Sequence, residues 1–513
     1  MLFQTDIAIV GSGIAGLSFA IKLAEARPDL DISIFTKEYP ESGNTIKAQG
    51  GIAVVLNNEQ DSFESHLEDT IKAGKGFNDP EVVRMVVEQA PQRLTELMQW
   101  GSNFDLSQNG DFDLGLEGGH SFNRILHKQD FTGFEIQTKL LAKAASYPNI
   151  KLFSRYFVTD LIIKSNEGVN TCVGIRALNL TKNILSEIKS KVTLLATGGS
   201  GKLFHNTTNP PVATADGVAM AYNAGADIAD MNFIQFHPTA LFEKNHGPLF
   251  LISEAVRGYG AYLVNNKGKR FLFQHDSRGE LATRDIISAS ILKELSDSGE
   301  KCVYLDCRHL DQKKFADHFP TIVEYCRKKG INVETDTIPV IPAAHYQCGG
   351  IKVDKNAQTS IKNLFASGEC SCTGLHGSNR LASNSLLEAI VFSHQAVKYL
   401  LPRLDKISRQ PNSISMESRS RIAYQKGKTL EKLKDRLKAL MTYELVYLTT
   451  PFEKENALKE LKLMRGLIKQ EFDKNCFSAE YFEIRNLVTA AYLVLEHAIL
   501  FQKKHRPKCS TFS

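Results

Sequence analysis

Four side chains that can carry positive charge stand among small or apolar residues, where such groups are uncommon. His237 lies in the run FIQFHPTAL, and His345 lies in PAAHY. Arg284 precedes an apolar helical pattern, and Arg380 lies in a loop rich in serine and asparagine. Because a guanidinium binds a carboxylate through two hydrogen bonds, two arginines and two histidines together suit a pocket for a dicarboxylate. A single buried histidine is usually structural, and residue types alone leave that alternative open.

A carboxylate stands in a similar context. Glu117 belongs to the glycine-rich stretch LGLEGGH at 114–120. Its negative charge would repel a dicarboxylate held by the groups above, unless the ligand also carries a cation at that point.

Strand ends and helix starts must hold these side chains. The segment GLHGSNRLASNSLLEA at 374–389 follows an apolar strand pattern at 364–369 that ends in a glutamate. It carries His376 and Arg380 and enters a helix through the polar residues 383–385. Free backbone N–H groups and an arginine at a strand's carboxyl end are typical of the place where open α/β sheets hold ligands. An ordinary helix start remains the alternative, since serine and asparagine are common N-caps.

The first 50 residues predict a nucleotide-binding fold. A strand at 6–10 precedes the glycine turn GSGIAG at 11–16, a helix at 17–27 and a second strand at 31–35. In this strand–turn–helix context the GxGxxG pattern indicates a dinucleotide whose pyrophosphate lies at the helix N-terminus. Because the second strand leads into Lys37 in place of a plain acidic residue, we expect Lys37 to meet either a phosphate or the adenosine end of a dinucleotide.

A second glycine-rich segment, GNTIKAQGG at 43–51, is dense in backbone hydrogen-bond donors. We expect it to line a flat cofactor ring. A surface turn is the alternative, but a surface turn would not continue into the apolar run IAVV at 52–55.

Two later strand patterns indicate that distant parts of the chain complete the first sheet. Residues 191–197 form an apolar run that leads into GGSG, and residues 364–369 form another. Between about 226 and 350 the chain has strand patterns of its own, at 261–264 and 302–305. A dinucleotide fold interrupted by an inserted second domain would produce this order.

Composition describes an ordinary soluble protein with more than one domain. The chain has 513 residues, of which 42% are hydrophobic and 23% charged, and its net charge is +5. That charge suits anionic small molecules as well as nucleic acid and decides little. After Pro402 apolar residues recur at helical spacing, and the lysines between 426 and 438 alternate with Leu and Glu. A solvated helix face is therefore favoured over a nucleic-acid site.

Cysteine use and hydropathy favour a reducing cytoplasm. Nine cysteines scattered over a long chain do not indicate a disulfide framework. Cys370 and Cys372 stand too close for the usual zinc spacing, so no metal is expected. The first strand begins almost at Met1, without a secretory pattern. The apolar run at 488–501 is interrupted by a glutamate and a histidine and is too short to span a bilayer, so no membrane span is expected.

The chain resembles the succinate dehydrogenase/fumarate reductase flavoprotein family over essentially its whole length. The motifs that carry the likeness are IVGSGIAGL, NTIKAQGGIA, EGGHSFNRILH, ATGGSGKLF, FIQFHPTAL, RGELATRD, IPAAHYQCGGI and ASGECSCTGLHGSNRLASNSLLEA. The resemblance implies an α/β fold with a Rossmann-like FAD-binding domain at 1–225 plus 346–402, an inserted α+β capping (substrate) domain at 226–345 and a C-terminal helical domain at 403–513.

The same resemblance implies a bound FAD. Relatives in membrane complexes link the flavin covalently to a histidine at the place where this chain has Asn44, so a non-covalent FAD is expected. Lys37 is similar to what stands at that position in the members that oxidise L-aspartate. The residues implied to hold FAD are Gly11, Ser12, Gly13, Ile14, Ala15, Gly16, Lys37, Asn44, Thr45, Ile46, Lys47, Ala48, Gln49, Gly50, Gly51, Asp216, Glu369, Ser385 and Leu386.

A dicarboxylate site is also implied. Glu117 stands where the dehydrogenases tend to have an amide, and its charge would suit an α-ammonium group. Ser253 stands where threonine is expected and keeps the hydroxyl, Thr283 stands where proline is expected, and the tail after His505 differs from the family pattern. The residues implied to bind substrate are Glu117, His237, Ser253, Arg284, His345 and Arg380, and those implied to be catalytic are Arg284, Glu117, His237 and His345.

The implied activity is oxidation of L-aspartate to iminoaspartate, by hydride transfer from Cα to flavin N5. O₂, which gives H₂O₂, or fumarate would then reoxidise the flavin. This reaction is the first step of de novo NAD (quinolinate) biosynthesis and implies handover of the product to quinolinate synthase. A monomer or homodimer is expected.

There are two alternatives, one from the same family and one from another class of protein. A soluble fumarate reductase or succinate dehydrogenase flavoprotein would share the fold and the dicarboxylate site, but Glu117 and Asn44 argue against it. An FAD-dependent RNA-modifying or nucleic-acid-binding protein would fit the glycine motif, the net charge and the lysine-rich tail. It would leave the two histidines and two arginines unexplained, so no nucleic acid is expected among the partners.

Overall fold

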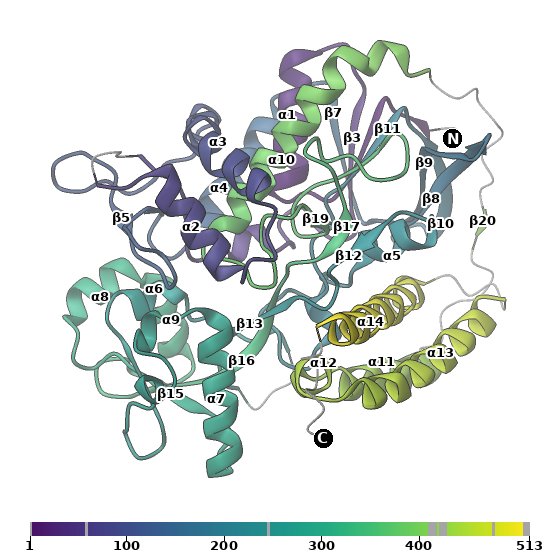
Figure 1. Ribbon diagram of the computed structural model, residues 1–513. Coiled ribbons are helices and arrows are strands. Elements are labelled where there is room, and N and C mark those ends of the chain that lie inside the picture. The colour runs from purple at the N-terminus through teal and green to yellow at the C-terminus, as the bar shows by residue number, and fades with distance from the viewer. Residues whose placement is uncertain are drawn as a thin grey trace, which may run out of the picture.

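A five-stranded parallel sheet forms the centre of the computed structural model (Figure 1). The structure describes residues 3–56, 60–243, 247–408, 418–419, 428–473 and 478–505. Every pairing in the central sheet is parallel, so all its carboxyl ends meet at one edge. In spatial order its strands are β18 (Leu364–Ala366), β11 (Val192–Leu195), β2 (Ile7–Val10), β3 (Ile32–Thr36) and β7 (Ile150–Ser154).

The predicted glycine turn connects β2 to the helix α1 (Ile14–Ala26). The helix begins three residues earlier than the predicted Leu17, inside the glycine motif itself. Gly11 has a φ of +114°, and a Cβ there would lie 2.1 Å from the carbonyl oxygen of Ala196 on the neighbouring strand end. A Cβ on Gly16 would lie 2.1 Å from the carbonyl oxygen of Gly11. Only glycine permits this close packing of turn, helix and strand.

Two strands return to the central sheet from far along the chain, which confirms the predicted interruption of the nucleotide fold. β11 pairs with β2 on one side and with β18 on the other. After β18 the chain reaches the helix α10 (Asn384–Leu400), which packs against α1. The predicted helix start is confirmed, and its N-cap residue, Ser383, has a φ of +58°. Both returning strands end before their last predicted residues, and those residues form loops.

A second sheet, which sequence analysis did not anticipate, lies beside the first. It is built from long strands that pair antiparallel, and a short N-terminal strand adds to it in parallel. Two small three-stranded sheets complete this part of the protein. The strands of the second sheet are β1 (Phe3–Gln4), β10 (Ile184–Lys189), β9 (Val169–Asn179), β8 (Tyr156–Asn166) and β20 (Ser418–Arg419); those of the small sheets are β12 (Ile228–Ala229), β17 (Gly350–Lys352) and β19 (Ser371–Cys372), and β4 (Ile52–Ala53), β6 (Ile125–Leu126) and β5 (Leu114–Gly115).

The inserted region has an antiparallel sheet and a hydrophobic core of its own. The strands predicted at 261–264 and 302–305 are present with small shifts. Its longest strand runs through the predicted domain boundary at 345/346, so the exact division into three domains stays a prediction. The strands are β13 (Ile234–Leu241), β16 (Ile338–Gln347), β15 (Val303–Asp306) and β14 (Tyr262–Val264), and the helices are α6 (Glu254–Gly258), α7 (Arg284–Ser298), α8 (Gln312–His318) and α9 (Pro320–Lys328).

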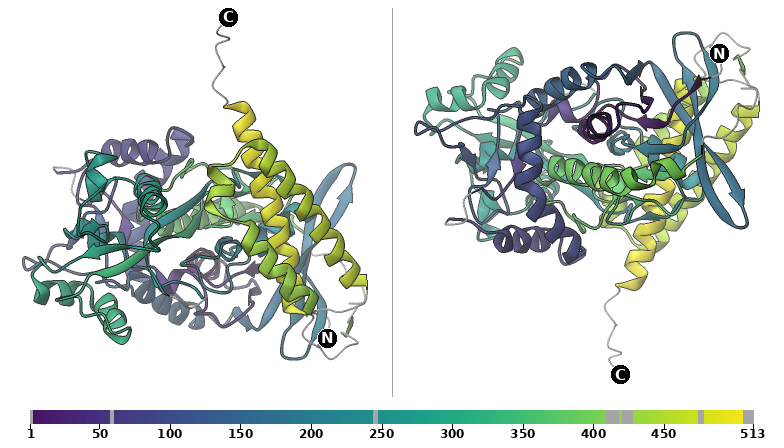
Figure 2. Two further views of the ribbon diagram at one scale, coloured as in Figure 1. Left: turned by 90° about the horizontal axis from the view of Figure 1, so that it is seen from below. Right: turned by 90° about the horizontal axis from the view of Figure 1, so that it is seen from above.

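Helices make up most of the described part of the C-terminal region. Figure 2 shows them side by side, next to the long strands of the second sheet. Lys426 and the tail after His505, both singled out in the sequence, lie outside the described residues. These helices are α11 (Lys428–Leu440), α12 (Tyr443–Tyr447), α13 (Pro451–Asp473) and α14 (Ala479–Lys504); the remaining α-helices are α2 (Phe63–Ala73), α3 (Pro80–Gln99), α4 (Thr132–Ala145) and α5 (Asp216–Asn223).

One of these helices, α14, is longer than the apolar run at 488–501 indicated. It has 26 residues, and by length and composition alone it could cross a membrane. In the structure 67% of its most apolar window is buried, and it packs against α13 and α5. The sequence estimate of its length was too short because a glutamate and a histidine fall inside the helix. α14 behaves as a core helix here.

Candidate functional site

One cavity of about 840 Å³ collects the predicted site residues. It lies where the carboxyl edge of the central sheet meets the antiparallel sheet of the inserted region. Every residue predicted to hold cofactor or substrate lines this cavity except Gly16, which packs against Gly11 in the turn. His376 does not line it. His376 instead contacts the carboxylate of Glu388, which also accepts a hydrogen bond from Tyr346.

The cofactor end of the cavity is shaped for a dinucleotide. The N-cap residues of α1 and α10, Gly13 and Ser383, give their helices no side-chain hydrogen bond, and residues from both helix starts line the cavity. Thr45 closes the glycine-rich loop onto the turn by accepting a hydrogen bond from the backbone N–H of Ile14 at 3.1 Å. Two helix N-termini at the cavity wall suit the negative charge of a pyrophosphate at one and developing charge on a flavin ring at the other. The residues therefore fit FAD.

Glu369 lies at the end of the loop that follows β18. Its carboxylate accepts hydrogen bonds from the side-chain amide of Asn44 and the backbone N–H of Gln347, both at 3.1 Å. A Cβ on Gly199 would lie 2.2 Å from that carboxylate, so the group is tightly enclosed. Burial raises the pKa of Glu369 to about 7, from an ordinary value of 4.5.

Glu369 should make the stability of the FAD-free protein depend on pH. Its folded pKa is above its unfolded pKa, so between about pH 4.5 and 7 the folded state binds more protons, and stability falls as pH rises. The full effect of a shift this size is about 3 kcal/mol. In urea unfolding at a series of pH values, Glu369→Gln should remove most of this slope. Equal slopes for variant and parent would contradict the raised pKa.

Lys37 follows β3 and has all three of its ammonium hydrogens engaged by protein oxygens. Nζ donates to Thr214 at 2.7 Å, to Asp216 at 2.9 Å and to Glu483 at 2.8 Å. The sequence predicts that Lys37 meets either a phosphate or the adenosine end of a dinucleotide. In this arrangement Nζ has no free hydrogen left to donate to a phosphate.

At the substrate end, the two predicted histidines lie on neighbouring antiparallel strands, β13 and β16, with ring centroids 5.0 Å apart. Nδ1 of His237 accepts a hydrogen bond from the backbone N–H of Thr239 at 3.3 Å, so its proton is on Nε2, which is buried without a partner among the described residues. Nδ1 of His345 contacts the hydroxyl of Thr208 at 2.8 Å. Burial and the nearby charge of Arg284 hold the pKa of both histidines well below the ordinary value. Both are therefore neutral and can serve as hydrogen-bond donors.

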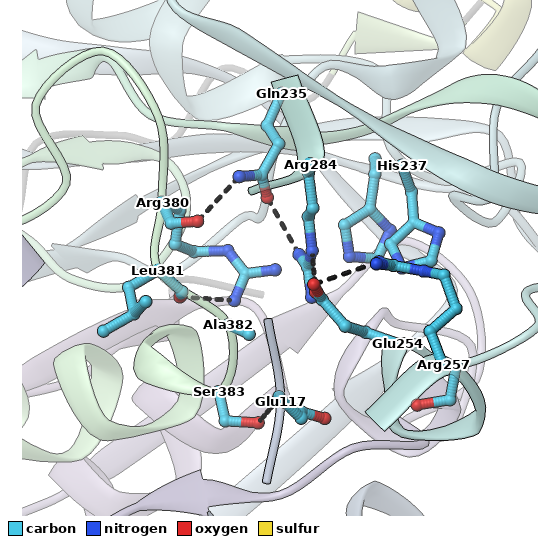
Figure 3. Close-up of polar contacts among 12 residues, drawn as sticks. Glu117, Gln235, His237, Glu254, Arg257, Arg284, Arg380, Leu381, Ala382 and Ser383 are labelled. Atoms are coloured by element: carbon cyan, nitrogen blue, oxygen red, sulfur yellow. Dashed lines mark hydrogen bonds and ion pairs between the residues drawn. The ribbon is translucent and has the colours of Figure 1, made fainter. Parts of the chain in front are cut away.

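Arg284 is the first residue of α7 and is held by two buried side chains. Its Nε donates to Glu254 at 2.5 Å, and its Nη1 donates to Gln235 at 2.8 Å. Glu254 also pairs with Arg257 at 3.0 Å, three residues along α6. Burial would raise the pKa of Glu254, but the two arginines outweigh it and the pKa is lowered. Figure 3 shows Arg284 between Arg380 on one side and His237 and Arg257 on the other.

Arg380 is 4% exposed, and its guanidinium retains unused hydrogen-bonding capacity. Nη1 makes a 3.4 Å contact with the carbonyl oxygen of Leu381, Cζ lies 4.5 Å above the ring of Tyr346, and Nε has no partner among the described residues. Burial, with Arg284 nearby, lowers the pKa of Arg380 to about 10. The side-chain amide of Gln235 donates to the backbone oxygen of Arg380 at 2.7 Å, and its oxygen accepts the hydrogen bond from Arg284. One glutamine thus fixes both arginines relative to each other.

Glu117 lies at the floor of the same cavity, below the arginines in Figure 3. It accepts a hydrogen bond from the hydroxyl of Ser383 at 2.5 Å. A Cβ on Gly50 would lie 2.6 Å from its carboxylate, so the group touches the loop implied to line the flavin. Burial and the neighbouring Glu254 raise the pKa of Glu117. A nearby cation would favour its charged form.

Three residues of this site were not predicted from the sequence: Gln235, Glu254 and Ser383. Gln235 and Glu254 hold Arg284, and Ser383 holds Glu117. Glu254 had a local signal, because it stands three residues before Arg257 in an otherwise apolar stretch. Of the predicted residues, Ser253 lines the cavity, and its hydroxyl also caps α6 by accepting from the backbone N–H of Ala255 at 3.3 Å.

Comparisons with known proteins agree with this site. Residues 6–386 match the family model described as an FAD binding domain. L-aspartate oxidase 2-a, chloroplastic, of Nicotiana tabacum is 44% identical to this chain over the matched residues. The match covers 79% of this chain and 63% of that protein's length. L-aspartate oxidase 1 of Ralstonia nicotianae is 39% identical over 96% of this chain and 92% of its own. A quinol-fumarate reductase structure with menaquinol molecules superposes with a TM-score of 0.87 at 31% identity, covering 98% of this chain and 91% of that one.

Fold and cavity define an FAD-dependent enzyme of the flavoprotein group that includes the fumarate reductases. Within that group the chain belongs to the L-aspartate oxidase family.

Proposed function

We propose that this enzyme oxidises L-aspartate to iminoaspartate. The observation that carries the proposal is the buried carboxylate of Glu117 in a cavity whose other charged and polar groups suit two carboxylates. L-aspartate has two carboxylates and one ammonium group, and each would meet a group of matching chemistry. A plain dicarboxylate would leave Glu117 facing a like charge or an apolar carbon.

The two carboxylates would be bound by Arg284, Arg380 and the neutral histidines, which donate without adding charge. Arg284 is oriented in advance by Glu254 and Gln235, so little freedom is lost when substrate binds. Nε2 of His237 and Nε of Arg380 have no partner among the described residues, so each keeps unused donor capacity. This supports the predicted substrate-binding set, and Ser253 adds a hydroxyl at the cavity wall.

Glu117 would orient the amino group and accept a proton from it. Loss of hydride from Cα requires the neutral amine, because the nitrogen lone pair forms the new C=N bond. A carboxylate whose pKa is raised by burial is a stronger base than an exposed one. When bound, FAD supplies the two-electron acceptor that takes the hydride at N5. Because Asn44 stands in the cavity wall where a linking histidine would be needed, FAD would be bound non-covalently.

When fumarate is the electron acceptor, one of its alkene carbons would take a hydride and the other would take a proton. Arg284, Glu254 and Arg257 form a continuous buried chain of polar groups that leads from the cavity to the backbone oxygen of Glu280. We propose this chain as the route by which a proton would reach Arg284. Fumarate or O₂ would then serve as the electron acceptor.

The wider role follows from the family. The product would enter de novo NAD biosynthesis through quinolinate synthase, and we propose a monomer or homodimer in the cytoplasm. A soluble fumarate reductase or succinate dehydrogenase flavoprotein is the second candidate, favoured by the similarity to the quinol-fumarate reductase structure. Glu117 separates the two candidates.

Glu117→Gln tests the proposal. Removing the charge should raise KM for L-aspartate roughly 100-fold, because a buried charge partner of the ammonium group is lost. KM for fumarate should change less than about threefold, since fumarate has no ammonium group. Steady-state assays with each substrate measure both. Ser383→Ala is the matched control: it removes the hydrogen bond to Glu117 but keeps the charge, so its effect should be smaller. Equal effects of Glu117→Gln on both substrates would remove Glu117 from this role.

A further inference from the structure

The C-terminal helix α14 reaches the wall of the cofactor cavity without lining the cavity. Glu483 and Asn486, one turn apart on α14, contact Lys37 and Asp216, which do line it. Lys37 directly follows β3, the second strand of the nucleotide fold, and Asp216 begins α5. In dinucleotide folds the end of that second strand is where the ribose of the adenosine half is bound.

The four side chains form one enclosed network. Lys37 donates to both Asp216 and Glu483, and the other oxygen of Asp216 accepts from Asn486 and from Thr214, each at 2.8 Å. Lys37 and Asp216 side chains are each 11% exposed, and Glu483 is 22% exposed. Burial would lower the pKa of Lys37, but the two carboxylates outweigh it and the pKa is raised, so the ammonium stays charged.

Charge and hydrogen-bond capacity decide what this network can bind. One ammonium and two carboxylates carry a formal charge of −1, which repels a phosphate. All three ammonium hydrogens are used, whereas each carboxylate oxygen can accept more than one hydrogen bond. The network therefore suits a ligand that donates hydrogen bonds, such as the hydroxyl pair of a ribose.

We propose that Glu483 and Asn486 are positioning residues for the adenosine half of FAD, so that a helix outside the nucleotide fold sets cofactor affinity. Glu483 holds Lys37, Asn486 holds Asp216, and together they fix the carboxylate that would face the ribose. The expected result of loosening either contact is weaker FAD binding through the adenosine half only.

The test uses the full chain freed of FAD and measures Kd for FAD and for FMN, which lacks the adenylate half, by quenching of flavin fluorescence. Glu483→Gln should raise Kd for FAD about tenfold, because a charged partner of Lys37 is lost, and should leave Kd for FMN within about twofold. Lys503→Gln is the matched control: Lys503 anchors the far end of the same helix to Glu455 on α13 and contacts no member of the network. Its Kd for FAD should stay at the parent value.

An unchanged Kd for FAD in Glu483→Gln would overturn the proposal. So would an equal weakening of FAD and FMN, since that would report a general loosening of the fold. If Glu483→Gln does not fold, Asn486→Ala carries the same test, because it removes the hydrogen bond to Asp216 and leaves every charge of the network in place. It should also lose affinity for FAD selectively, and parent-like binding there would overturn the proposal as well.

Discussion

An Arg380→Leu variant is expected to lose roughly a thousandfold in kcat/KM with both L-aspartate and fumarate. Arg380 is a buried cation with unused donors at the substrate end, so its removal leaves one substrate carboxylate without a charged partner. The variant should still fold, because burial already disfavours this charge and lowers its pKa to about 10. Steady-state kinetics with both substrates measure the loss, and FAD content checks the fold.

A matched control exists for this variant. Arg403 also stacks on a tyrosine ring, with Cζ 4.0 Å from the centroid of Tyr399, but it is exposed and does not line the cavity. Arg403→Leu should leave kcat/KM within about twofold of the parent. If Arg380→Leu retains more than about a tenth of the parent activity, Arg380 does not bind a substrate carboxylate.

The second large effect is expected for Arg284→Lys. Lysine keeps the positive charge but loses the fork that reaches Glu254 and Gln235 together. Substrate should still bind through charge, so KM should rise less than about tenfold. The polar chain toward Arg257 is broken, so kcat for fumarate reduction should fall roughly 100-fold to 1000-fold. Steady-state kinetics separate the two parameters.

Arg308→Lys is the corresponding control, since Arg308 binds Asp306 through two hydrogen bonds in the inserted region and lies outside both the cavity and the polar chain. It should show parent-like kcat and KM. A change in KM alone for Arg284→Lys would mean that Arg284 binds substrate without any part in the proton route.

Much of the fold could be predicted because its signals are local. The glycine turn works through contacts within a few residues, with one exception: Gly11 is required by the close approach of Ala196, which is distant in the sequence. The strands that return to the central sheet were visible as short apolar runs ending in glycine. The second sheet was missed because its strands β8 and β9 are only partly buried and lack a clear alternation.

The residues of the site could also be predicted only in part. Side chains that contact ligand stand out, since a charge among apolar residues is visible in one sequence. Residues that hold those side chains do not stand out. Nothing in the sequence distinguishes Gln235 from other glutamines, and only the fold places it between Arg284 and Arg380. Glu483 lies 446 residues from Lys37 in the chain. Only the packing of α14 against α5 brings the two together.

The most direct test of the central claim is an anaerobic titration of the purified, FAD-containing protein, followed by the visible absorbance of the flavin. L-aspartate should bleach the flavin, because its ammonium group meets Glu117 and its carboxylates meet the two arginines. D-aspartate, which presents Cα with the opposite hand, and succinate, which lacks the amine, should leave the absorbance unchanged. Bleaching by succinate without bleaching by L-aspartate would contradict the assignment and favour the dicarboxylate dehydrogenase.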